Sequence, residues 1–260
     1  MYFFQVGQDL YRHYDEKVQG AGSVLGLMGS YGRADVDYSD KYRAVDGVVS
    51  SNKYMGSGKV ESGALGAYYT KWGQKGAYLD LVGQVSYLRN TYKADSVTGR
   101  GKSTQDGYGF AVSAEVGAPY RLGNSHWSIE PQAQLIYQWV TLDDFHDGTR
   151  LVKHGDTDGL RGRLGARFAY NAPTKNLRTK TFYGIANVYH DFMGNDSSAW
   201  VGRDIVGESY NDTWYEVGVG AQLPIGKSTY IYGDARYEHS FSGAKREGYR
   251  GSIGLKFQWH

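Results

Sequence analysis

Apolar and polar residues alternate along most of the chain. Between Trp127 and Trp139, one set of alternate positions carries Trp, Ile, Pro, Ala, Leu, Tyr and Trp, while the other carries mainly Ser, Glu and Gln. The last run repeats this pattern, with Ile253, Leu255 and Phe257 separated by Gly and Lys. A period of two residues is typical of a β-strand with two unlike faces, and no helical period persists anywhere in the sequence. The chain is therefore predicted to be all-β.

The same reading of the whole chain predicts about eleven strands, each of a length suited to crossing a bilayer. Their approximate spans are 2–15, 23–37, 61–72, 77–89, 108–120, 127–141, 160–170, 181–192, 214–223, 229–241 and 249–259. No Pro- or Ser-rich linker interrupts them, so residues 1–260 are predicted to form one domain.

Short and long connections alternate between these strands. The short ones fall near 16–22, 73–76, 121–126, 171–180 and 224–228, and the long polar ones near 38–60, 90–107, 142–159, 193–213 and 242–248. In outer-membrane barrels, short turns face the periplasm and long loops face the outside. A soluble sandwich meets the same water at both ends and has no reason for such alternation. The pattern predicts an antiparallel transmembrane β-barrel.

Composition narrows the function classes. The 260 residues include 37 Gly, 24 Tyr and no Cys, which excludes disulfide scaffolds, cysteine-ligated metals and thiol catalysis. The net charge of +2 is too balanced for an obvious nucleic-acid partner. A mean hydropathy of −0.56 is compatible with a membrane barrel, because its strands average apolar and polar positions.

Aromatic residues cluster at the ends of the predicted strands, where amphipathic rings suit the headgroup level of a membrane. The sequence therefore predicts aromatic girdles formed by Trp72, Tyr87, Tyr108, Tyr120, Trp127, Trp139, Tyr170, Trp214 and Trp259.

Charged residues share faces within single strands. An arginine that faces lipid at mid-membrane costs about 2–4 kcal/mol, so a strand with three of them on one face must turn that face to water. We expect the carboxylates to neutralise the arginines across a wet lumen. The predicted lumen-lining residues are Asp80, Glu115, Glu130, Arg161, Arg163, Arg167, Asp234, Arg236 and Glu238.

The strand number is odd, whereas single-chain bacterial barrels have an even number because both of their termini lie at the periplasmic side. The first predicted strand ends in a short turn and the last follows a long loop, so both run toward the periplasm. We therefore expect either one further strand before Met1 or an error of one in the count.

Several segments resemble the C-terminal β-domain of classical autotransporters, the translocators of type V secretion. They are Gly63–Trp72, Gly76–Asp80, Trp127–Leu135 and Gly162–Arg167, and the most specific stretch is Glu130-Pro131-Gln132-Ala133-Gln134-Leu135. The resemblance covers nearly the whole chain and matches Tyr2–Asp15 to the second strand of the family.

The resemblance implies a twelve-stranded barrel in the Gram-negative outer membrane that anchors an N-terminal passenger and assists its export. The first strand and a plug helix would then lie upstream. The implied partners are outer-membrane lipid and lipopolysaccharide, the barrel-assembly machinery and the chain's own passenger segment. The last strand resembles the family's assembly signal, with Ile253, Leu255, Phe257 and Trp259 as its residues. The sequence departs from that pattern because His260 follows the terminal aromatic residue.

Two other functions stay open. One is a stand-alone outer-membrane pore or adhesin that uses its long loops as an interaction surface. The other is a protease at the outer rim, with Asp143, Asp144, His146, His190 and Asp191 as its candidate acidic and histidine groups. Other histidines lack the spacing of metal ligands. The favoured interpretation assigns the chain no catalytic residue, metal or cofactor.

Overall fold

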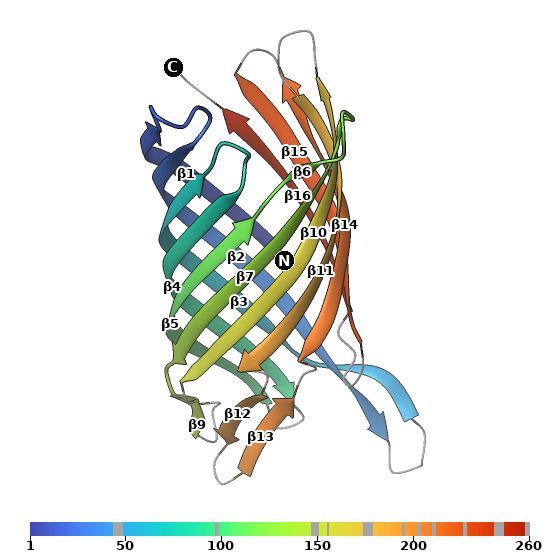
Figure 1. The fold of residues 1–260 in the computed structure, drawn as a ribbon. Helices are drawn as coiled ribbons and strands as arrows, with labels where there is room; N and C mark the ends of the chain where they lie inside the picture. Colours follow the sequence, from blue (N-terminus) through green and yellow to red (C-terminus); the bar gives the residue numbers. More distant parts are fainter. Residues whose placement is uncertain are drawn as a thin grey trace.

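The computed structural model describes all residues except 44–48, 97–98, 147–150, 155, 174–178, 194–195, 202–203, 210–211, 226–227, 242–246 and 258–260. Eleven long strands of the described residues form one antiparallel sheet that curls around a central space (Figure 1). They are β1 (Tyr2–Tyr14), β2 (Gly22–Arg43), β3 (Val49–Trp72), β4 (Tyr78–Ser96), β5 (Gly99–Gly117), β7 (Trp127–Leu142), β10 (Thr157–Pro173), β11 (Thr179–Met193), β14 (Thr213–Ile225), β15 (Thr229–Ser240) and β16 (Glu247–Phe257).

The eleven predicted strands are confirmed, and each pairs with its neighbour in chain order. The short strand β6 (Tyr120–Arg121) adds to β7 at one end of the sheet. At the two edges, the described residues of β1 and β16 share no ladder, although Lys256 on β16 interacts electrostatically with Asp9 on β1. The eleven strands therefore leave a seam between their first and last members.

Two predicted long loops are largely strand. Tyr38 pairs with Gly56, and the β2–β3 ladder reaches Arg43 and Val49, so most of 38–60 continues the sheet. The β4–β5 ladder likewise runs through to Ser96 and Gly99. A paired hairpin that is exposed to water on both faces needs no apolar side chains. Its sequence can therefore look like that of a polar loop.

A second, four-stranded sheet gathers the long connections after β7 and β11. It contains β8 (Phe145–His146), β9 (Leu151–His154), β12 (Asp196–Val201) and β13 (Asp204–Ser209) in the order β13-β12-β9-β8. These strands lie beyond the same end of the main sheet, below it in Figure 1. The predicted loops 142–159 and 193–213 thus include elements that pair with each other.

The apolar residues of the main sheet lie mainly on its outer face. Leu65 is 70% exposed, Leu164 69% and Val219 67%, and each alternates with a less exposed neighbour along its strand. Ala21, Val152, Ala169 and Trp214 are the buried apolar residues among those the structure describes. This distribution reverses that of a soluble protein and suits a wall whose outer face contacts hydrocarbon.

Tyrosine rings on the inner face lie over glycines of adjacent strands. Tyr68 covers Gly26, Tyr183 covers Gly220, and in each case a Cβ added at the glycine would collide with the ring. The other pairs of this kind are Tyr78 with Gly117 and Tyr232 with Gly254. The missing side chain lets a ring lie flat on the neighbouring strand, which packs the wall without filling the interior.

Candidate functional site

The inner faces of β4, β5, β7 and β10 carry a first polar cluster. Arg163 places Nη2 2.8 Å from Oε2 of Glu115, reaching over Gln134, which lies opposite both residues in the ladder. The Tyr78 hydroxyl donates to Oε1 of Glu115 at 2.7 Å. The Arg163 side chain is only 10% exposed, so this ion pair is shielded from water more than a surface pair is.

Glu130 joins the same cluster from β7. Gln132 donates to Oε1 of Glu130 at 2.6 Å, and Arg167 lies opposite Glu130 with Nη1 3.8 Å from Oε2. The Arg167 guanidinium also lies over the Tyr183 ring, 4.4 Å from its centroid. Arg163 and Arg167, the two predicted lumen arginines of this cluster, therefore each have a carboxylate partner within the wall.

Glu216 on β14 is the centre of a second cluster. Its side chain is 4% exposed, Oε2 accepts from Arg250 at 2.8 Å, and Oε1 accepts from Arg236 at 3.2 Å. Asn187 on β11 donates to Oε1 at 2.8 Å, and the Tyr189 hydroxyl adds a longer contact of 3.3 Å. One buried carboxylate thus links four strands through charged or polar groups.

Three further predicted lumen residues are the carboxylates Asp234, Asp80 and Glu238. Asp234 accepts from Arg236 at 2.7 Å and from the Ser252 hydroxyl at 2.7 Å. Asp80 accepts from the Thr70 hydroxyl at 2.6 Å. Glu238 lies opposite Glu216 in the β14–β15 ladder.

Arg161 pairs bidentately with Asp191, at 2.6 and 3.0 Å, and its guanidinium lies 4.6 Å from the ring centre of Trp214. Trp214 is 1% exposed and stacks on Tyr189 at 5.2 Å, so its prediction as a girdle residue is wrong. Its parity along β14 places it with Glu216 on the inner face, and that parity was visible in the sequence.

His190 and Asp191 of the candidate rim protease do not form the predicted histidine–carboxylate pair. His190 and Asp191 are successive residues of β11 and therefore point to opposite faces of the sheet. Nδ1 of His190 is 2.8 Å from the Thr213 hydroxyl, whereas Asp191 pairs with Arg161. Among the described residues, no group of three or more His, Asp or Glu side chains is arranged to hold a metal ion.

An outer charge row crosses four strands on the outer face. Arg33, Glu61, Arg89 and Asp106 lie opposite one another on β2 to β5. Arg89 pairs with Asp106 at 2.8 Å, and this hydrogen bond lowers the pKa of the Asp106 carboxyl. Hydrogen bonds from Lys59 and then from Tyr31 lower the pKa of Glu61.

The row just inside the outer charge row is aromatic. It contains Tyr31, Tyr87 and Tyr108, and the rings of Tyr87 and Tyr108 are 5.5 Å apart. Leu65, Val85 and Phe110 follow in the next row. The order from charge through tyrosine to aliphatic side chains is the profile of a membrane boundary. The charge row therefore lies outside the apolar band.

A second aromatic group lies near the opposite end of the sheet. Trp127 stacks on Phe168 at 4.8 Å and contacts Tyr170 at 4.9 Å, all on the outer face. The predicted assembly residues also face outward: Ile253 is 81% exposed, Leu255 69% and Phe257 56%. Trp259 lies outside the described residues.

The structure brings together most of the predicted charged residues, but not in the predicted way. Glu115, Glu130 and Asp234 meet arginines of the same or nearby strands of the wall, whereas the prediction paired them across the lumen. Glu216, Arg250, Tyr78, Tyr189 and Asn187 were missed. Each has the inner-face parity of its strand: Tyr78 that of Asp80 on β4, Glu216 that of Trp214 on β14, and the other three the parity opposite to an outward residue, Val188 on β11 or Ile253 on β16. Alternation was therefore the signal that could have found them.

A two-sided antiparallel wall of long strands defines a β-barrel membrane protein. None of the described residues forms a helix that could cross a membrane. The family described as Autotransporter beta-domain matches residues 1–236. The chain belongs to this family, whose barrels are outer-membrane proteins.

Relatives and solved structures agree with this assignment. The adhesin BmaC autotransporter of Brucella suis biovar 1 (strain 1330) is 30% identical over 233 residues, which cover 84% of this chain and 6% of BmaC. The serine protease pet autotransporter of Escherichia coli O44:H18 (strain 042 / EAEC) is 28% identical over 215 residues, covering 72% of this chain and 16% of that protein. This chain thus spans a small part of the curated relatives.

Two crystal structures share the fold. The β domain of the Bordetella autotransporter BrkA superimposes with a TM-score of 0.72 at 20% identity, covering 99% of this chain and 90% of BrkA's. The transport unit of AIDA-I from Escherichia coli gives a TM-score of 0.74 at 17% identity, with 99% and 82% covered. The prediction of an autotransporter β-barrel is confirmed.

Proposed function

We propose that the chain is the outer-membrane translocator and anchor of an N-terminal passenger in type V secretion. The observation that carries the proposal is the contrast within β10, where Leu164 is 69% exposed on the outer face and Arg163 pairs with Glu115 on the inner face. A wall of this kind holds the barrel in hydrocarbon and keeps its interior wet.

The predicted lumen residues would line the passage. Arg163, Arg167 and Arg236 each form an ion pair with a carboxylate of the wall, so the inner face is polar without a large excess of one charge. An unfolded passenger segment can exchange water with such a face without being held by uncompensated charges.

We place the extended β2–β3 and β4–β5 hairpins outside the cell and the last strand's end in the periplasm. The outer charge row supports this orientation, because Arg33 and Arg89 would lie at the level of the phosphorylated headgroups of lipopolysaccharide, next to the tyrosine row. Ile253, Leu255, Phe257 and Trp259 would be read by the barrel-assembly machinery as the alternating apolar face of the last strand.

The unpaired seam between the described residues of β1 and β16 supports one further strand upstream. The upstream helix that would occupy the pore rests on the family alone. An open edge in hydrocarbon leaves backbone N–H and C=O groups without partners, which costs several kcal/mol for each group.

Disulfide crosslinking tests for the intervening strand, and introduced cysteines have no native competitor because the chain has no cysteine. In the full-length protein, Gln8→Cys and Leu255→Cys should not crosslink, since an intervening strand separates them by about 10 Å. Efficient crosslinking would show that β1 and β16 are neighbours.

No catalytic group is assigned to the barrel. Asp191 is bonded to Arg161 and lies on the other face from His190, which argues against the rim protease. A stand-alone pore or adhesin is less favoured, because the relatives named above are autotransporters of which this chain covers only 6% and 16%.

Surface exposure of the passenger tests the proposal. The full-length gene product is expressed with an epitope in the segment upstream of Met1, and intact cells are treated with protease. The epitope should be removed in cells whose barrel shows heat-modifiable mobility on gels, and not in a Phe257→Asp control that fails to assemble. A folded barrel with a permanently protected epitope would refute translocation.

A further inference from the structure

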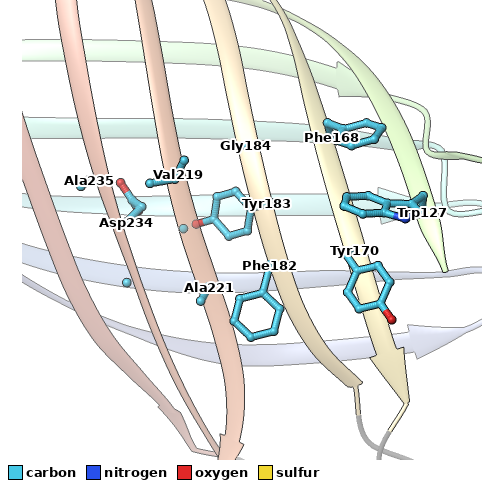
Figure 2. Close-up of a pocket in the computed structure, with 12 residues that line it drawn as sticks. Trp127, Phe168, Tyr170, Phe182, Tyr183, Gly184, Val219, Ala221, Asp234 and Ala235 are labelled. Carbon is cyan, nitrogen blue, oxygen red and sulfur yellow. The ribbon is translucent and has the colours of Figure 1, made fainter.

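The outer face of the sheet has a hollow near the end that carries Trp127 and Tyr170. It has a volume of about 670 Å³, within the size range of small-molecule sites. Figure 2 shows Phe168, Phe182 and Val219 projecting around it from β10, β11 and β14. We refer to this feature as the outer-face hollow.

The ladder explains the shape of the outer-face hollow. Phe168, Gly184, Val219 and Ala235 lie opposite one another on four strands, and the next row contains Tyr170, Phe182, Ala221 and Gly233. Large side chains at Phe168, Tyr170 and Phe182 give way to Gly184, Ala221, Gly233 and Ala235, with Val219 as the one larger side chain among them. The surface is therefore recessed between the aromatic group and Ile253, which is 81% exposed on β16.

The chemistry of the residues around the hollow indicates which kind of ligand fits it. Its outward-facing side chains between the aromatic residues are apolar, whereas Tyr183 and Asp234, which also line it, have the inner-face parity of their strands. An apolar recess in the outer face of a membrane wall is filled by hydrocarbon. Trp127 and Tyr170 lie at one end of the hollow and give an amphipathic rim suited to the headgroup level. The matching ligand is an acyl chain that enters from the leaflet at that end.

Lys180 offers a positive charge to the phosphate of a lipid whose acyl chain lies in the hollow. It is exposed and lies two residues before Phe182, on the same face of β11 and farther toward the strand end. Four residues separate Lys180 from Gly184, about 13 Å along the strand and about 10 Å along the membrane normal at a tilt of about 40°. Half the hydrocarbon thickness is about 15 Å, so a chain whose phosphate lies at Lys180 would run through the hollow toward mid-membrane.

We propose that the outer-face hollow binds one acyl chain of a phospholipid of the periplasmic leaflet, with the lipid phosphate paired to Lys180. This inference rests on the proposed placement of the barrel in the outer membrane. The gain over an ordinary boundary lipid comes from dispersion contacts, which a recessed surface makes on more sides of the chain than a smooth one. Charge attraction adds to it at the headgroup.

The test uses the full-length protein in phosphatidylethanolamine–phosphatidylglycerol vesicles that contain a trace of phosphatidylethanolamine with a diazirine in one acyl chain. After illumination, labelled peptides are identified by mass spectrometry. Ala221→Leu and Ala235→Leu fill the hollow with side chains of unchanged polarity. Ala114→Leu, on the exposed outer face of β5, is the matched control. Heat-modifiable mobility is measured in every sample.

Labelling should concentrate on the peptides of Phe182, Ala221 and Ala235, and the filling variants should lower it about fivefold, with Ala114→Leu unchanged. Lys180→Gln should lower labelling by the phospholipid but not by a diacylglycerol with the same diazirine chain. Uniform labelling of an inserted barrel, or equal labelling of all variants, overturns the lipid site and leaves the translocator proposal intact. A chain that does not insert overturns both.

Discussion

Leu164→Arg tests the assignment of the two faces of the wall most directly. It places an arginine next to Arg163 in the chain but on the opposite, apolar face. Six residues separate Leu164 from Tyr170 in the aromatic group on β10, about 20 Å along the strand and about 15 Å along the membrane normal at a tilt of about 40°. The apolar band of a barrel is about 25 Å tall, so Leu164 lies near its middle.

An arginine at that depth should cost about 2–4 kcal/mol of folding free energy in the bilayer, a shift of roughly 30- to 1,000-fold in the equilibrium constant. The matched control is Ser113→Arg, which adds the same side chain on the inner face, two residues from Glu115. There the guanidinium meets water and a carboxylate, so the change should be within about 1 kcal/mol.

The assay is denaturant titration of the full-length chain in phospholipid vesicles, followed by tryptophan fluorescence and by heat-modifiable gel mobility. The difference between the two arginine variants is the informative quantity, because both add one charge and one long side chain. If Leu164→Arg and Ser113→Arg differ by less than about 0.5 kcal/mol, the assignment of the two faces is wrong.

Three further outcomes follow from the wall. Gly220→Ala should destabilise the barrel, because the new Cβ collides with the Tyr183 ring, whereas Gly184→Ala, whose Cβ meets only a carbonyl at 3.8 Å, should be close to neutral by the same titration. Glu216→Leu should cost about 2–3 kcal/mol, since it leaves the arginines bonded to it without their carboxylate; an unchanged midpoint would mean that water replaces it freely. The lowered pKa of Asp106 means that its bond to Arg89 contributes above the ordinary carboxyl pKa of about 3.9 and is lost as pH falls through the folded value. In Arg89→Gln, the Asp106 midpoint measured by NMR should rise toward that ordinary value, and an unmoved midpoint would exclude the arginine as the cause.

Much of the wall was predictable from local pattern. The eleven strands and the outward position of Leu164, Ile253 and Leu255 follow from alternation, because successive side chains of any strand point to opposite faces whatever the strand pairs with. The same rule would have placed Trp214 on the inner face with Glu216. Its prediction as a girdle residue gave weight to its position at a strand end and ignored its parity.

The extent of the ladders was not predictable. Residues 38–60 and 90–107 lack an apolar face, so their sequence does not distinguish a paired hairpin from a loop. The pairing of β9 with β12 joins connections that lie far apart in the chain, and no local pattern specifies such a contact.

The sequence by itself determined that this chain forms long strands with one apolar and one polar face, because that property depends on covalent geometry and on the order of residues. Only the tertiary structure decided which charges meet. Arg163 reaches Glu115 over Gln134, and Arg250 reaches Glu216 from β16, because register and curvature bring together residues of different strands. The outer-face hollow has the same origin: small residues of three strands form a recess only after the ladder has aligned them.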